Sequence, residues 1–207
     1  MKDFRRKVFN PNEIDNLKKE FVHIFLKGAF FEEAGKVILT ESDKEILKII
    51  FNWLIGNVNI KENKGLFLTG PFGTGKSVIL KGIIQFITKY YSDLNTYGGI
   101  SQPLYLIAQD MCNYFSDGND FMVTRMRNTS ILALDDIGYE SKIVKYFGTE
   151  IKPFEEIIMS RYDKGRHILI STNKTLDEIG FEYGHHIYDR IKQMCYIVQF
   201  KGNSKRK

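Results

Sequence analysis

The feature that most constrains the fold of this chain is a short glycine-rich stretch, Gly70-Pro71-Phe72-Gly73-Thr74-Gly75-Lys76-Ser77. It fits the pattern G-x-x-x-x-G-K-[ST]. An apolar run at residues 65–69 precedes it, and apolar residues at helical spacing follow it from residue 78 to residue 87. Because a buried strand, a glycine-rich turn and a helix form the context in which this pattern binds phosphate, the sequence predicts a phosphate-binding loop, or P-loop.

The residue types of this loop suit a triphosphate. Glycines let backbone N–H groups approach the phosphates without a Cβ in the way, and the following helix directs the positive end of its dipole toward them. Lys76 is expected to reach the β- and γ-phosphates of ATP, and the Ser77 hydroxyl to ligate Mg²⁺. A glycine-rich turn before an ordinary helix is the alternative. The predicted nucleotide-binding residues are Gly70, Pro71, Phe72, Gly73, Thr74, Gly75, Lys76, Ser77 and Val78.

Two adjacent carboxylates end a second apolar run, Ile131-Leu132-Ala133-Leu134-Asp135-Asp136. This is the Walker B pattern, in which a buried strand delivers an acid to the edge of the sheet beside the P-loop. Asp135 is expected to hold Mg²⁺ with Ser77, and Asp136 to orient or deprotonate the attacking water. A strand that ends in a solvated acidic turn is the alternative, but a preceding P-loop favours the functional interpretation. Glu140 is the next carboxylate that could act as the base.

Composition places the chain among globular proteins. Of its 207 residues, 43% are hydrophobic and 27% are charged, and no apolar run is as long as a membrane span. The N-terminus leads to no signal-peptide core, so we expect a cytoplasmic protein without a membrane partner and with Cys112 and Cys195 reduced. The net charge of +5 is concentrated in the basic ends, residues 1–7 and 201–207. These ends either contact nucleic-acid phosphates or are solvated termini.

Hydrophobic spacing predicts the remaining elements. Helices are expected at residues 11–27 and from a capping box at Ser42–Glu45 onward, and irregular or short helical structure at residues 109–128. Further strands are expected at residues 103–108, 167–171 and 195–200, and helices around residues 153–162 and 187–192. The predicted division is a helical N-terminal adaptor region, residues 1–60, followed by a P-loop ATPase domain, residues 61–207.

The order of these motifs resembles that of AAA+ ATPases of the DnaC/IstB helicase-loader type, over about residues 60–204. The matching text is Gly65-Leu66-Phe67-Leu68-Thr69-Gly70, Gly75-Lys76-Ser77, Leu134-Asp135-Asp136-Ile137-Gly138-Tyr139-Glu140, Ser160-Arg161-Tyr162, Ser171-Thr172-Asn173, Tyr183-Gly184, Asp189-Arg190-Ile191 and Gly202-Asn203-Ser204. By this resemblance, Asn173 corresponds to sensor 1 at the γ-phosphate, although a helix cap would also explain it. Arg190 corresponds to the arginine finger that enters a neighbouring subunit's ATP site, although a structural arginine that pairs with a carboxylate of its own subunit is the alternative. Arg161 is a second candidate for an interface role.

The resemblance implies a P-loop α/β three-layer sandwich with parallel sheet order 5-1-4-3-2 and without a C-terminal lid. It also implies Mg²⁺-dependent ATP hydrolysis in a homo-oligomer that loads a replicative helicase, with residues 1–60 gripping the partner and single-stranded or duplex DNA in contact. A transposition helper that grips a transposase shares every motif. Two further alternatives are a small nucleotide kinase, since Ser160-Arg161-Tyr162 superficially matches the Asp-Arg-Tyr of thymidylate kinases, and an adaptor that binds ATP as a switch without hydrolysing it.

Overall fold

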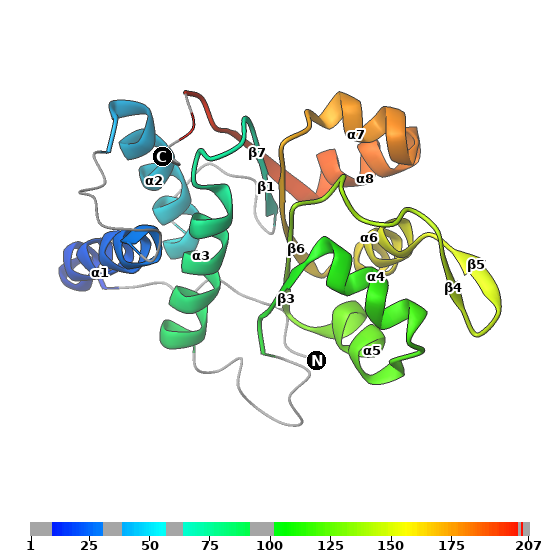
Figure 1. The fold of residues 1–207 in the computed structure, drawn as a ribbon. Helices are drawn as coiled ribbons and strands as arrows, with labels where there is room; N and C mark the ends of the chain where they lie inside the picture. The colour runs from blue at the N-terminus through cyan, green and yellow to red at the C-terminus, as the bar shows by residue number, and fades with distance from the viewer. Residues whose placement is uncertain (1–9, 31–38, 57–63, 92–101, 203, 205–207) are drawn as a thin grey trace.

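The computed structural model describes residues 10–30, 39–56, 64–91, 102–202 and 204 (Figure 1). Within them, the central sheet consists of five parallel strands: β1 (Gly65–Thr69), β2 (Leu104–Ile107), β3 (Ile131–Asp135), β6 (His167–Thr172) and β7 (Cys195–Gln199). Their order across the sheet is β2-β3-β6-β1-β7. Counted along the chain and read from the other edge, this is the predicted order 5-1-4-3-2, which is therefore confirmed.

The three central strands end level with one another. Every residue of β1, β3 and β6 is buried, as expected for parallel strands that helices cover on both faces. Thr69, the last residue of β1, pairs with Thr172, the last residue of β6. Leu134 pairs with Ile170, so the carboxyl end of β3 reaches the same edge of the sheet. Residues that directly follow these strands are thereby brought together.

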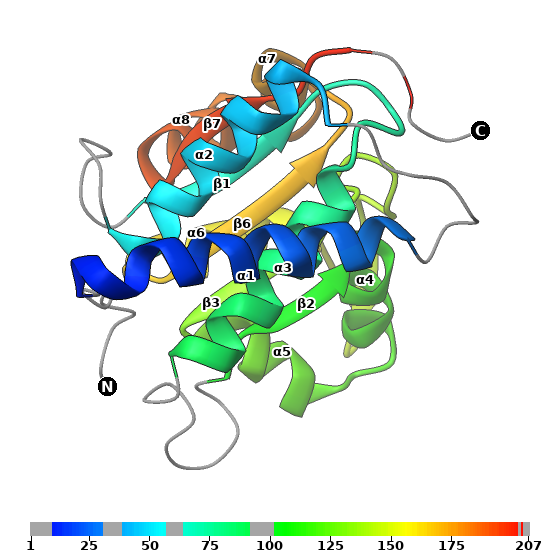
Figure 2. The same ribbon diagram turned by 90° about the vertical axis from the view of Figure 1, so that its left-hand side faces the viewer.

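Helices cover both faces of the sheet and complete the predicted three-layer sandwich (Figures 1 and 2). On one face lie α1 (Pro11–Phe30), α2 (Glu41–Ile55) and α3 (Lys76–Tyr90). On the other lie α4 (Ala108–Ser116), α5 (Asp120–Asn128), α6 (Pro153–Asp163), α7 (Leu176–Tyr183) and α8 (His185–Met194). Each face has its own hydrophobic cluster. No helix of the described residues has the length and apolarity that a membrane crossing requires.

The first two helices share the hydrophobic cluster of the α3 face. Leu17, Phe21 and Phe25 of α1 are buried in it, and the Phe21 ring meets the Phe86 ring of α3 edge-on at a centroid distance of 5.8 Å. Trp53 of α2 is completely buried there as well. Thus α1 packs against the helix that follows the P-loop, and α2 belongs to the same hydrophobic cluster. A domain boundary at residue 60 stays a prediction.

The predicted capping box of α2 is wrong by two residues. Thr40, not Ser42, is the N-cap: its side chain accepts from the Asp43 N–H, and the Asp43 carboxylate accepts from the Thr40 N–H at 2.8 Å. Thr40-x-x-Asp43 overlaps Ser42-x-x-Glu45 in the sequence, and the earlier start adds residues to the helix. The basic residues at 1–7 and 205–207 lie outside the described residues, so their expected DNA contacts stay a prediction.

A hairpin between β3 and α6 was not anticipated from the sequence. It consists of β4 (Val144–Tyr146) paired antiparallel with β5 (Thr149–Ile151). Its turn residues, Phe147 and Gly148, have φ of 47° and 83°. Two-residue hairpin turns favour such angles, but the usual sequence signal is Asn-Gly or Asp-Gly, and phenylalanine does not provide it.

Arg161 does not reach the surface, so the expected interface role is wrong. Its completely buried guanidinium on α6 donates to the carbonyl oxygens of Met126 at 2.6 Å, Thr129 at 3.1 Å and His167. Burial, and then the charge of Arg166, lower the pKa of Arg161 to about 9. This arginine therefore joins the end of α5 to the start of β6. It cannot contact a ligand phosphate, whereas the kinase alternative would require such a contact.

Replacing Arg161 with methionine is expected to lower the free energy of unfolding by ~3 kcal/mol or more, because buried carbonyl groups lose their donor. Urea denaturation followed by circular dichroism measures this. The control is Arg127→Met, which removes an ion pair with Glu156 whose side chains are 31% and 29% exposed, and it should cost under ~1 kcal/mol. Equal losses in the two variants would contradict a structural role for Arg161.

Candidate nucleotide-binding site

The loop between β1 and α3 has the shape that phosphate binding requires. Gly70, Gly73 and Gly75 have φ of 139°, 72° and 95°, which side chains strongly disfavour. Gly70 is constrained by a close approach as well as by its backbone angle, since a Cβ there would lie 2.3 Å from the carbonyl oxygen of Phe200. Gly75 is the N-cap of α3 and has no side chain with which to cap the helix. The first N–H groups of α3 are therefore available to an anion.

Lys76 connects the P-loop to the turn after β6. Its side chain is only 5% exposed, and its Nζ donates to the carbonyl oxygens of Gly70 and Pro71 and to Oδ1 of Asn173, each at 2.7 Å. Lys76 and Asn173 are 97 positions apart in the sequence, and the structure brings them into contact at the edge of the sheet where a phosphate site is predicted. The acceptors are neutral oxygens, so an anionic phosphate would bind this ammonium more strongly.

The Asp135 carboxylate lies beside the P-loop and accepts hydrogen bonds from other segments. It is 2% exposed. One oxygen accepts from Ser77 Oγ at 3.1 Å and from Ser171 Oγ, and the other accepts from the Tyr105 hydroxyl at 2.6 Å. Burial, and then the hydrogen bond to Asp135, raise the pKa of Tyr105 well above its ordinary value, so the phenol stays a donor.

The predicted Mg²⁺ ligands fit the metal. Ser77 and Asp135 are in direct contact, and both offer the hard oxygen atoms that Mg²⁺ prefers. A buried carboxylate next to the start of α3 places negative charge where the metal must join the phosphates. A shift of the Ser77 and Ser171 hydroxyls would free Oδ1 of Asp135 for the metal or for its bound water.

Asp136 turns away from Asp135 at a strained position. Its φ is 59°, in the left-handed region that few non-glycine residues adopt, and its N–H donates to Ser171 Oγ at 3.2 Å. The backbone turn leaves Asp135 buried and Asp136 exposed at the same edge of the sheet. Strain of this kind is concentrated at functional sites. The geometry suits a carboxylate that acts on solvent water.

The loop that follows Asp136 offers no exposed carboxylate at Glu140 that could replace Asp136 as the base. Glu140 is buried and accepts from the N–H groups of Gly138 and Tyr139, so it is poorly placed as a substitute base. Tyr139 instead meets the P-loop at the surface: its ring lies 5.7 Å from that of Phe72, and the two residues are 56% and 59% exposed. The tip of the P-loop and the loop after the acidic pair therefore form one exposed aromatic rim.

Arg190 is separate from these contacts. It lies on α8, half-buried, with its guanidinium stacked on the Tyr162 ring at 4.0 Å from the centroid. Its Nε is buried and has no hydrogen-bond partner among the described residues, and no described carboxylate forms an ion pair with it. Within the part of the chain that the structure describes, no ion pair therefore explains this arginine.

Sequence reasoning missed two of the residues that hold Asp135. In the sequence, Ser171 appears only as the first residue of the motif Ser171-Thr172-Asn173 that resembles the loader family, and Tyr105 is part of a predicted apolar strand. The available signal was a hydroxyl-bearing residue on each strand that flanks the acidic one, since β2 and β6 both pair with β3. Knowing that a buried carboxylate needs donors would have directed attention to them.

Comparison with known proteins agrees with this architecture. No family model matches the chain, and no curated protein does. Among solved structures, the DnaC helicase loader is 19% identical with a TM-score of 0.62, and the match covers 88% of this chain and 99% of that one. DnaI is 17% identical with a TM-score of 0.63, covering 91% of this chain and 93% of that one. The replication initiator DnaA bound to AMPPCP and single-stranded DNA is 16% identical with a TM-score of 0.56, covering 82% of this chain and 50% of that one. The chain therefore has the fold of an AAA+ P-loop ATPase.

Lys76→Ala is expected to abolish ATP binding and to leave the fold intact, because the substitution removes the buried ammonium of the P-loop. Calorimetric titration with ATP and Mg²⁺ measures the affinity. Lys81→Ala, an exposed lysine on the same helix, is the control and should bind normally. If the Lys76 variant keeps its affinity, Lys76 is not part of the phosphate site.

Proposed function

We propose that this protein binds ATP with Mg²⁺ and hydrolyses it within a homo-oligomer, in order to load a replicative helicase. The observation that carries the proposal is the convergence of Lys76, Ser77, Asp135 and Asn173 at the carboxyl edge of the sheet. The fold is shared with a helicase loader and with an initiator bound to an ATP analogue, which supports this choice of nucleotide and of process.

ATP binding begins at the P-loop. The N–H groups of the loop and of the first turn of α3 surround the phosphates, while Lys76 exchanges the carbonyl oxygens of Gly70 and Pro71 for phosphate oxygens. Asn173 remains in contact with this lysine and presents its amide to the γ-phosphate. Ser77 and Asp135 would hold Mg²⁺, which would supply positive charge beside the phosphates.

Hydrolysis then depends on Asp136. A water oxygen attacks the γ-phosphorus, the bond to the oxygen that bridges the β- and γ-phosphates breaks, and the proton of the water passes to Asp136. The exposed position of this carboxylate gives it access to water. The left-handed backbone conformation of Asp136, with φ of 59°, fixes the direction of the side chain. The N–H of Asp136 and the carboxylate of Asp135 both bond Ser171, so the base and the metal ligand move together.

Arg190 acts in the site of a neighbouring subunit. Stacking on Tyr162 holds the guanidinium plane while leaving its N–H groups without a carboxylate partner in the described chain. A second subunit would supply the negative charge, namely the γ-phosphate as it departs. Assembly on a helicase or on DNA would thereby control the rate of hydrolysis. Residues 1–60 are the proposed adaptor for the helicase; within them α1 packs directly against α3, and α2 belongs to the same hydrophobic cluster.

Asp136→Asn is expected to bind ATP normally and to hydrolyse it at least ~10²-fold more slowly, the scale of losing a general base. Phosphate release under single-turnover conditions measures the rate. Asp163→Asn, which alters an exposed carboxylate on α6, is the control and should keep full activity. Undiminished turnover by the Asp136 variant would place the base elsewhere.

Mixing two inactive variants tests whether Arg190 works across an interface. Arg190→Ala should bind nucleotide normally and lose stimulated hydrolysis ~10³-fold, the lower end for arginine fingers. Mixed with Asp136→Asn, it should recover part of the activity, because some interfaces pair an intact site with an intact finger. Co-assembly of the two variants without any recovery would show that the arginine does not act in trans.

A further inference from the structure

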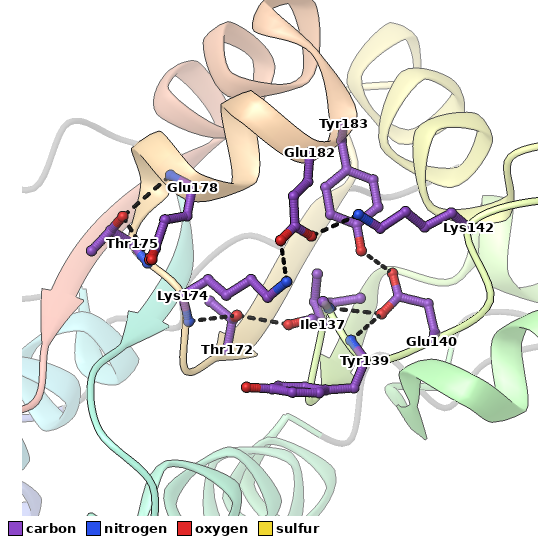
Figure 3. A network of polar contacts seen from close by, with 11 residues as sticks. Ile137, Tyr139, Glu140, Lys142, Thr172, Lys174, Thr175, Glu178, Glu182 and Tyr183 are labelled. Carbon is purple, nitrogen blue, oxygen red and sulfur yellow. Dashed lines mark hydrogen bonds and ion pairs between the residues drawn. The ribbon is translucent and has the colours of Figure 1, made fainter.

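The end of α7 contacts two loops of the site at once (Figure 3). The first loop comprises residues 136–142 and begins with the proposed base. The second comprises residues 173–175 and begins with Asn173. Glu182 and Tyr183, in the last turn of α7, bond to side chains of both loops. None of the residues that make these contacts belongs to the predicted phosphate-binding or metal-binding set.

Glu140 holds the first loop to α7. One of its oxygens accepts from the N–H of Gly138 at 2.7 Å and of Tyr139 at 3.1 Å, and the other accepts from the Tyr183 hydroxyl at 2.5 Å. Burial, and then the bond to Glu140, raise the pKa of Tyr183 far above its ordinary value, so the hydroxyl remains a donor. Bonds between a buried carboxylate and such donors are strong, and they fix the shape of the loop.

Glu182 joins the first loop to the second. It accepts from Lys142 Nζ at 2.8 Å and from Lys174 Nζ, and the two lysines come from different loops (Figure 3). Lys174 directly follows Asn173 and packs closely over Gly138, where a Cβ would lie 2.7 Å from its Cε. Although burial raises the pKa of Glu182, the hydrogen bonds from Lys142 and Lys174 hold it below its ordinary value. The carboxylate therefore stays charged between the two ammonium groups.

The first loop is also bonded to the end of β6, the strand that leads directly into the second loop. The Ile137 N–H donates to the Ser171 carbonyl at 3.0 Å, and the Thr172 hydroxyl donates to the Ile137 carbonyl at 2.7 Å. Earlier on α7, a Cβ on Gly180 would lie 3.1 Å from the Tyr188 side chain of α8. Because α7 and α8 are in such close contact, a shift of α7 must displace the helix that carries Arg190.

We propose that Glu140 and Glu182 are positioning residues that fix Asp136 relative to Asn173 through α7. A change at either loop when the γ-phosphate binds or leaves is then passed to α8 and to Arg190. This inference rests on the proposed function and extends it, since it assigns a role in hydrolysis to two carboxylates outside the site and names the helix that links the site to the subunit interface.

The kinetic test uses Glu182→Gln, which keeps the size of the side chain and removes its charge. Turnover at saturating ATP should fall about tenfold, within the range of long-range coupling, while the affinity for ATP stays within about twofold of the wild type. Asp177→Asn makes the same charge change in the first turn of the same helix and should leave both quantities unchanged. Glu182→Asp should restore part of the turnover because it restores the charge.

A second test measures opening of the first loop and does not depend on ATP hydrolysis. Cys112 is buried beneath the first loop, with its thiol donating to the Ser141 carbonyl at 3.1 Å, and burial is the main reason that its pKa rises to about 12. It reacts with iodoacetamide only when the loop opens. In Glu182→Gln, alkylation of Cys112 at pH 8, measured by mass spectrometry, should accelerate at least about fivefold. Alkylation of the buried Cys195 on β7, which reports global unfolding, should not change.

The outcomes separate the inference from the proposed function. If the wild type hydrolyses no ATP but Cys112 alkylation accelerates as expected, the loop contact stands and the coupling to hydrolysis is overturned. Wild-type turnover and wild-type Cys112 alkylation in Glu182→Gln overturn the positioning role altogether. Equal acceleration at Cys112 and Cys195 shows a loss of global stability and also overturns it. Should Glu182→Gln not fold, Lys142→Met removes one of the two partners at a more exposed position and must give a smaller change in the same direction.

Discussion

The buried carboxylate of Asp135 joins the segments on which the site depends. Placing a charge at 2% exposure costs free energy unless its oxygens accept hydrogen bonds, and here the donors come from Ser77 on α3, Tyr105 on β2 and Ser171 on β6. They reach Asp135 because β1, β3 and β6 run parallel and end at one edge. The same arrangement that satisfies this carboxylate places the P-loop, the acidic pair and the turn of Asn173 around one space.

Much of this arrangement could be predicted because its signals are local in the sequence. Continuous apolar runs identified the strands, since parallel strands covered on both faces have no polar side. Glycines before Lys76 identified the loop, because few other residues adopt its backbone angles. The position of Asn173 at the ligand edge follows from the rule that the ends of parallel strands gather there, whereas its hydrogen bond to Lys76 was visible only in the fold.

What could not be predicted depends on partners that are distant in the sequence. Arg161 follows a serine on a helix and gives no local sign that its guanidinium binds carbonyl groups 35 and 32 positions away. Glu140 is a carboxylate after an acidic pair, and only the fold shows that Tyr183, 43 positions later, occupies one of its oxygens. For the same reason, Tyr105 and Glu182 became recognisable only when neighbouring strands and loops were in place.

Amide hydrogen exchange with and without ATPγS and Mg²⁺ tests most directly the central claim, that three segments distant in the sequence bind one nucleotide. The account predicts slower exchange in peptides that cover residues 70–78, 136–142 and 172–175, and unchanged exchange in the hairpin at residues 144–151. Saturating nucleotide that leaves exchange in residues 70–78 unchanged, or that protects them without the other two segments, would contradict it.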